Sequence, residues 1–249
     1  MIKPISLQLL SYISQSKDTQ VTVPYKHEPV SDVFVKSVLP PIDIVRIKNL
    51  NISHFRLVDS NSVRGVTLAK QPTRILKELK NSGINTIVDL RQETSETSQY
   101  AQDCINNGLN YFNFKLKLNM PIFNNQFSTH MSSKEVAQFN MQFKDNLVKF
   151  FEIMNKGRYY ISCLLGLHRT DLAMCMNYLL NPREPESPPL LSHMYIDGET
   201  NFTNKYIGAI KNLYKNLSAE DRAKMGMPEN FREIFDARIS KLRLMNAIK

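Results

Sequence analysis

The sequence of 249 residues has no tryptophan, only three cysteines and only eight glycines. Three widely spaced cysteines cannot form a disulfide framework, and their spacing matches no zinc-binding pattern. No apolar run reaches the roughly 18 residues that a membrane-spanning helix needs. The segment Met1–Leu10, with one lysine and an interrupted apolar patch, is a poor signal peptide. We therefore expect a cytoplasmic protein without an integral membrane segment, although a protein exported into another cell by a specialised secretion system would look the same.

The formal net charge of +9 favours an anionic partner, such as a phosphorylated protein, a phospholipid head group or a nucleic acid. A solvated basic surface explains the charge equally well. No cluster of Lys and Arg is dense enough to indicate nucleic-acid binding. The charge therefore favours an anionic partner, and we expect that it is not a nucleic acid. Nothing in the sequence predicts a metal or a cofactor.

One stretch carries most of the chemical information. The apolar run Tyr159-Tyr160-Ile161 leads into Cys163, a short loop with one glycine follows, and residues 171–180 form a helical pattern. This order predicts a strand, a tight loop and a helix. Loop N–H groups and the N-terminus of a helix together attract an anion, and the planar fork of Arg169 matches two phosphate oxygens.

The same stretch predicts a nucleophile. A thiolate at Cys163 would be stabilised by the cradle and could attack phosphorus, while Arg169 and the loop amides hold the phosphate oxygens. The Thr170 hydroxyl could stabilise the thiolate as it leaves in the second step. The expected phosphate-binding positions are Leu164, Leu165, Gly166, Leu167, His168 and Arg169. The alternative is a structural cysteine at a strand end, with Arg169 in a surface ion pair.

Cys163, Gly166, Arg169 and Thr170 match the signature loop of the cysteine-dependent protein tyrosine phosphatase superfamily, which the segment resembles: His-Cys, five residues with a central Gly, Arg, then Ser or Thr. Ser162 stands where that pattern has His.

Upstream, Arg64-Gly65, Pro72 and the run Gly83–Arg91 are similar to the opening of compact dual-specificity-type phosphatases. The resemblance covers roughly residues 53–180. It implies a metal-independent phosphatase that acts on phosphotyrosine or dual-specificity protein substrates through a cysteinyl-phosphate.

The expected fold class is α/β, with a central mixed, largely parallel sheet flanked by helices. We expect an N-terminal extension over residues 1–52, in which Val21–Val23 and Val33–Val35 are possible strands. A phosphatase domain should follow over 53–249, with an insertion near 181–201 and C-terminal helices. Strands are predicted at 55–58, 63–66, 84–91, 111–118 and 159–161, and helices at 73–79, 94–107, 132–155, 171–180, 202–217 and 228–247.

The general acid is the weak point of the resemblance. The family places an aspartate on the loop after the strand predicted at 111–118, where this chain has Asn119. Asp197 is the best candidate elsewhere, whereas Asp171 would put a negative charge near the phosphate. Otherwise the enzyme acts only on good leaving groups such as phenolates, or the protein is a pseudophosphatase that binds phosphate and turns over poorly.

The apolar loop rim favours an aromatic phosphate, so phosphotyrosine protein is the first expected substrate. A phosphoinositide is the second expected substrate. Phosphatases of that class often carry lysines in the loop, and this loop has none. Asp89 and Arg91 either help to position the loop or form a strand-end salt bridge, and the second interpretation is favoured. Cys104 and Cys175 are expected to be buried, and the last helix to pack on the domain rather than to bind a membrane.

Overall fold

The computed structural model describes residues 41–71, 73–117, 120–123, 132–183, 188–189, 191 and 201–247. The chain divides between Leu39 and Pro40, and every described residue belongs to the part that begins at Pro40. The possible strands at Val21 and Val33 lie outside the described residues.

The domain therefore begins earlier than residue 53. Helix α1 (Ile44–Lys48) is capped by Asp43, whose side chain accepts from the amide of Arg46. Ile47 is fully buried, and Ile42 and Ile52 are nearly so, within the same apolar cluster as α2. Burial of these side chains ties residues 42–52 to the domain rather than to an extension.

Five strands of the described chain form one sheet in the order β1-β2-β5-β3-β4. The strands are β1 (Arg56–Asp59), β2 (Ser62–Val66), β3 (Thr86–Asp89), β4 (Asn110–Asn113) and β5 (Tyr159–Cys163). β1 is antiparallel to β2, and the other pairs are parallel. All residues of β5 are buried, as expected for the central strand of a sheet covered on both faces. The predicted α/β class with a mixed, largely parallel sheet is confirmed.

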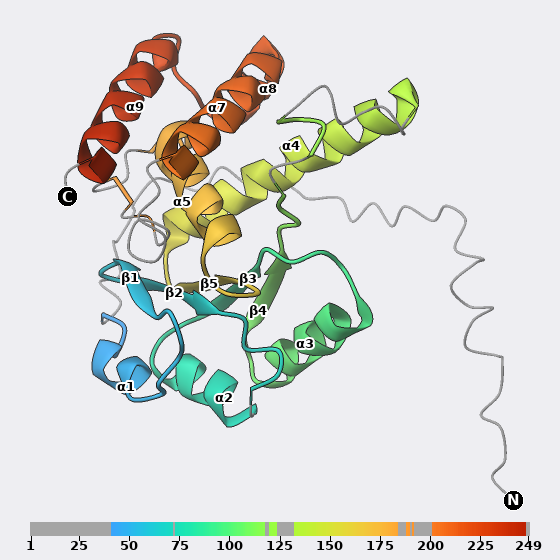
Figure 1. The fold of residues 1–249 in the computed structure, drawn as a ribbon. Helices are drawn as coiled ribbons and strands as arrows, with labels where there is room; N and C mark the ends of the chain where they lie inside the picture. Colours follow the sequence, from blue (N-terminus) through green and yellow to red (C-terminus); the bar gives the residue numbers. More distant parts are fainter. Residues whose placement is uncertain are drawn as a thin grey trace, which may run out of the picture. The chain divides into compact units, whose positions relative to one another are not determined.

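Helices cover both faces of this sheet (Figure 1). On one face lie α1, α2 (Thr73–Asn81) and α3 (Ser95–Asn106), and on the other α4 (Ser133–Lys156), α5 (His168–Leu180), α7 (Asn201–Asn216), α8 (Ala219–Lys224) and α9 (Phe231–Ala247). Each face has its own apolar core. The sequence predicts the longer helices, whereas α1 and α8 are too short for their periodicity to be seen.

Helix α4 shows how local signals set an element. The Ser132 hydroxyl accepts from the amide of Glu135, and the Glu135 carboxylate accepts from the amide of Ser132. Gly157, with φ of 68°, ends the helix and turns the chain into β5. Phe143 and Leu147 are buried in the core from one face of the helix. The predicted capping box and apolar stripe are both confirmed.

The C-terminal helix packs on the domain, as predicted. Phe231, Phe235 and Leu242 are buried. Arg238, itself 5% exposed, donates to the carbonyl of Asn181 at 2.6 Å. Its guanidinium also lies over the Phe231 ring. None of the helices in the described part of the chain combines the length and apolarity needed to cross a membrane.

Candidate active site

The predicted strand, loop and helix are found where expected. β5 ends at Cys163 and α5 begins at His168, so residues 164–167 form the connecting loop. The amide of Thr67 donates to the carbonyl of Cys163, and the amide of Leu90 donates to that of Ser162, both at 2.9 Å. Cys163 therefore lies at the C-terminal end of the central strand, between the ends of β2 and β3. Parallel sheets commonly bind ligands at this edge.

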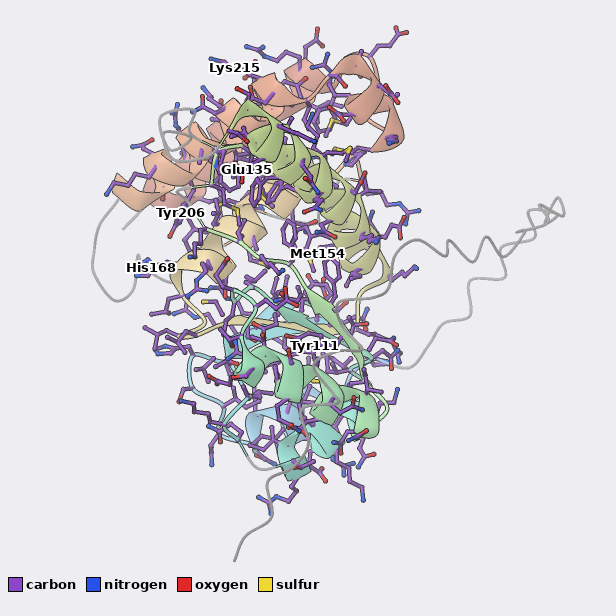
Figure 2. The ribbon with its side chains drawn as sticks, turned by 90° about the vertical axis from the view of Figure 1, so that its right-hand side faces the viewer. Tyr111, Glu135, Met154, His168, Tyr206 and Lys215 are labelled. Carbon is purple, nitrogen blue, oxygen red and sulfur yellow. The ribbon has the colours of Figure 1, made fainter. Side chains whose placement is uncertain are left out.

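Exposure alternates sharply along the loop. Cys163 is 4% exposed, whereas the next two side chains, Leu164 and Leu165, are 51% and 54% exposed. Leu167 is buried and His168 is exposed at the start of α5 (Figure 2). A shielded thiol thus lies beside an exposed apolar rim.

Gly166 is a position that only glycine can occupy. Its φ is 70°, and a Cβ there would lie 2.8 Å from the amide nitrogen of Val66 and closer still to the carbonyl of Gly65. Gly65 in turn has no room for a Cβ beside the hydroxyl of Tyr160, which donates to the carbonyl of Val66. Gly166 thus lets the loop backbone lie directly against β2, and Gly65 leaves room for the Tyr160 hydroxyl.

Arg169 lies in the first turn of α5 and is half-buried. Its Nη1 donates to the carbonyl of Leu90 at 3.5 Å, a length at which a hydrogen bond is weak. The guanidinium is thus held only loosely toward the end of β3, and it can turn its planar face and its donors toward an anion in the loop.

Ser162 directly precedes the cysteine and Thr170 directly follows Arg169, and both side chains are fully buried. Neither Ser162 Oγ nor Thr170 Oγ1 has a hydrogen-bond partner among the described residues. A buried hydroxyl without a partner carries a desolvation cost, and such groups occur where a ligand or an ion completes the bonding.

An arginine that the sequence analysis did not assign a role lies beneath the loop. Arg64 of β2 forms a salt bridge with Asp171 of α5, with 2.5 Å between Nη2 and Oδ1, and the two side chains are 3% and 0% exposed. The same Nη2 donates to the carbonyl of Gly166 at 3.0 Å. Asp171 is therefore buried and paired, which removes it from the possible proton donors.

The Asp89–Arg91 pair is a strand-end salt bridge, as favoured from the sequence. Arg91 Nε and Nη2 both donate to the Asp89 carboxylate, and Nη2 does so at 2.7 Å. The Tyr111 hydroxyl donates to Asp89 at 2.9 Å, and Arg91 also pairs with Glu96. Burial raises the pKa of Tyr111, and the negative charge of Asp89 raises it further, so the phenol remains a donor.

Helix α7 adds a tyrosine that sequence reasoning missed. Tyr206 is fully buried, and burial raises its pKa, with a further increase from the nearby negative charge of Asp171. Helical spacing marks Tyr206 as a core residue, but only the packing of α7 on α5 brings it close to Asp171.

The structure does not test the two positions considered for the general acid. Asn119 and Asp197 both lie outside the described residues.

Cys104 and Cys175 are buried, as predicted. Burial raises the pKa of Cys104 to about 12, with the negative charge of Asp89 as a further cause. Within the described ranges, no group of three or more His, Cys, Asp and Glu side chains is arranged to hold a metal ion.

Comparison with known proteins finds similarity only among solved structures. No family model and no curated protein matches the sequence. A candidate phosphatase (DUF442) from Shewanella putrefaciens CN-32 is 13% identical with a TM-score of 0.44, over 72% of this chain and 98% of that one. A Cys-to-Ser variant of TpbA from P. aeruginosa, solved in complex with phosphotyrosine, is 10% identical with a TM-score of 0.30, over 78% and 91%. At these values the similarity is one of backbone arrangement.

Proposed function

We propose that the protein is a metal-independent phosphatase that hydrolyses phosphomonoesters through a cysteinyl-phosphate. One observation carries the proposal: Cys163 lies at the C-terminal end of the central strand, with Arg169 on the first turn of the helix that follows. The helix N-terminus and the loop amides supply partial positive charge at the place where a phosphate above the thiol would lie. A structural cysteine would need none of these features.

The proposed hydrolysis proceeds in two steps, formation of the cysteinyl-phosphate and its hydrolysis. The thiolate of Cys163 attacks phosphorus, an S–P bond forms, and the bond to the leaving oxygen breaks as that oxygen takes a proton. Water then attacks phosphorus, the S–P bond breaks, and inorganic phosphate and the thiolate are released. Arg169 binds two of the three equatorial oxygens, and the loop amides stabilise the charge on them as it redistributes.

Thr170 serves the second step in this scheme. It follows Arg169 directly, and its buried hydroxyl has no other partner among the described residues. A hydroxyl that donates to the departing sulfur stabilises the thiolate and makes it a better leaving group. Ser162, on the other side of the cysteine, occupies the position of the family histidine and is equally buried.

The preferred substrate in this proposal is a phosphotyrosine side chain in a protein. Leu164 and Leu165 expose large apolar surfaces next to the thiol, and an aromatic ring can bury part of them. A polyphosphoinositide carries extra phosphates, and residues 164–168 offer no lysine to bind them. The rim therefore favours a phenolate leaving group, which also needs the least help from a general acid.

The source of the proton separates two versions of the proposal. Asn119 cannot donate a proton as an aspartate does, so Asp197 is the candidate general acid. If Asp197 is the acid, Asp197→Ala lowers kcat on an alkyl phosphate by about 10²-fold or more and has little effect on a substrate with a good leaving group. Equal effects on both substrates would remove Asp197 from the mechanism.

The proposal is tested with para-nitrophenyl phosphate in the presence of EDTA. We expect turnover by the wild type, none by Cys163→Ser, and near-normal turnover by the matched control Cys104→Ser, in which another buried cysteine is changed. Phosphotyrosine peptide should be preferred over phosphoserine peptide and over phosphoinositide vesicles. If the folded wild type binds phosphate but shows no turnover, the phosphatase proposal is wrong and the protein is a phosphate-binding pseudophosphatase.

A further inference from the structure

The Arg64–Asp171 ion pair joins three parts of the site through one guanidinium. Arg64 extends from β2, Asp171 belongs to the first turn of α5, and Gly166 is the central residue of the loop between β5 and α5. Nη2 of Arg64 lies 2.5 Å from the Asp171 carboxylate and 3.0 Å from the Gly166 carbonyl. Strand, loop and helix are therefore connected at a single buried nitrogen.

The bond to Gly166 matters because of how an anion-binding loop is built. When successive N–H groups point toward an anion, the carbonyl groups between them point away, and each buried carbonyl then needs a donor. Gly166 is buried against the backbone of β2. Arg64 supplies the donor on that side. Without it, the carbonyl would be unsatisfied, and this bond would no longer hold the Gly166 peptide in its orientation.

The charge of Asp171 matters for a second reason. A carboxylate in the first turn of a helix interacts favourably with the helix dipole, but here it also lies close to the place proposed for a dianionic phosphate. The Asp171 side chain is fully buried, so solvent screens it poorly. Arg64 offsets that negative charge and keeps the potential at the loop favourable for an anion.

We propose that Arg64 and Asp171 are positioning residues for the phosphate loop: Arg64 holds the Gly166 carbonyl away from the phosphate, and Asp171 holds Arg64 in place. The inference rests on the proposed phosphate-binding function of the loop. It assigns neither residue a direct contact with substrate.

Under this proposal, the two single variants should differ in their affinity for phosphate. Arg64→Met removes the guanidinium that pairs with the buried Asp171 carboxylate and supports the Gly166 carbonyl, so inorganic phosphate should bind at least about tenfold more weakly. Asp171→Asn keeps an oxygen that can accept from Arg64 and removes the negative charge, so phosphate should bind as tightly as in the wild type or more tightly. Both variants should lose stability, because each breaks the buried ion pair from one side.

The experiment measures inorganic phosphate binding by calorimetry, with urea denaturation of each variant as the measure of stability. Both variants are made in the Cys163→Ser background, where binding does not depend on turnover. Arg91→Met is the matched control, because it breaks a comparable buried pair that does not contact the loop. Phosphate affinities that fall together for Arg64→Met and Asp171→Asn, in proportion to lost stability, would overturn the proposal.

A paired variant covers the case in which the single variants do not fold. In Arg64→Met with Asp171→Leu, both charges are replaced by apolar side chains, a change that proteins often tolerate. We expect a folded protein with phosphate binding still reduced by about tenfold or more, because the Gly166 carbonyl lacks its donor. Wild-type affinity in that variant would show that the pair serves only stability. Wild-type protein that binds phosphate without turnover would instead contradict the proposed enzyme and leave this inference intact.

Discussion

Asp89 and Asp171 are both fully buried, both lie at the C-terminal edge of the sheet, and both are paired with an arginine. Asp89 pairs with Arg91, two residues further along the chain, and its other contacts come from the neighbouring Tyr111. Asp171 pairs with Arg64, 107 residues away, through a nitrogen that also binds the loop. The same chemical pair closes one strand end in the first case and connects the parts of a site in the second.

This comparison separates stability from function. Loss of the Asp89–Arg91 pair, which has no bond to the loop among the described contacts, should lower only the free energy of unfolding. A pair that also fixes a loop carbonyl should change ligand affinity when it is lost. Variants of the Asp89–Arg91 pair therefore show how far an effect on stability can be separated from an effect on phosphate binding.

The largest expected effect is that of Arg91→Met. Asp89 would keep its bonds from Tyr111 and from the amide of residue 91, but it would lose the guanidinium that now binds both carboxylate oxygens. Breaking a buried ion pair from one side typically costs about 3–5 kcal/mol, and the remaining donors place this variant near 3 kcal/mol. Urea denaturation measures that loss.

Phosphate affinity and kcat of folded Arg91→Met should be unchanged, because no bond joins Arg91 to residues 163–170 among the described contacts. If phosphate binding instead weakens as much as in Arg64→Met, then Arg91 positions the loop and the contrast between the two pairs disappears.

A smaller effect is expected for Tyr111→Phe. The Tyr111 hydroxyl donates to a buried carboxylate, and its loss should cost about 1–2 kcal/mol in the free energy of unfolding. In the Arg91→Met background the same change should cost more, since Tyr111 is then the main side-chain donor left to Asp89. A double-mutant cycle of urea denaturation curves measures this coupling, and strict additivity would mean that the two donors act independently.

The smallest effect is expected at a partly exposed pair. Lys144 of α4 and Asp221 of α8 lie 2.5 Å apart, each about one fifth exposed. Partial burial favours the neutral carboxyl, but hydrogen bonds from Lys144 and Ser218 outweigh it and lower the pKa of Asp221. Because the folded-state pKa is lowered, this stabilisation is present at neutral pH and is lost as pH falls through that pKa.

Asp221→Asn should therefore cost about 0.5–1 kcal/mol at pH 7, with a difference from the wild type that shrinks toward pH 3. Lys144→Met is the matched control and should show the same pH dependence. Denaturation midpoints measured across this range provide the test, and a difference that is constant with pH would exclude the ion pair as its source.

The sequence by itself determined the elements and the centre of the site. Apolar periodicity, the capping box at Ser132 and Glu135, and the stop at Gly157 act over a few residues, so they can be recognised without a fold. The same holds for the strand, loop and helix around Cys163, since these elements are consecutive in the chain. The Asp89–Arg91 bridge was also predictable, because its partners are two residues apart.

Only the tertiary structure decided which distant residues complete the site. Arg64 meets Asp171 because β2 lies beside β5 in the sheet, an order that no local pattern encodes. Tyr206 joins the core because α7 packs on α5, and Ile47 joins the core because α1 packs on α2. Local geometry fixes which side chains share a face, whereas the partner of each face depends on how all the elements bury their apolar surface together.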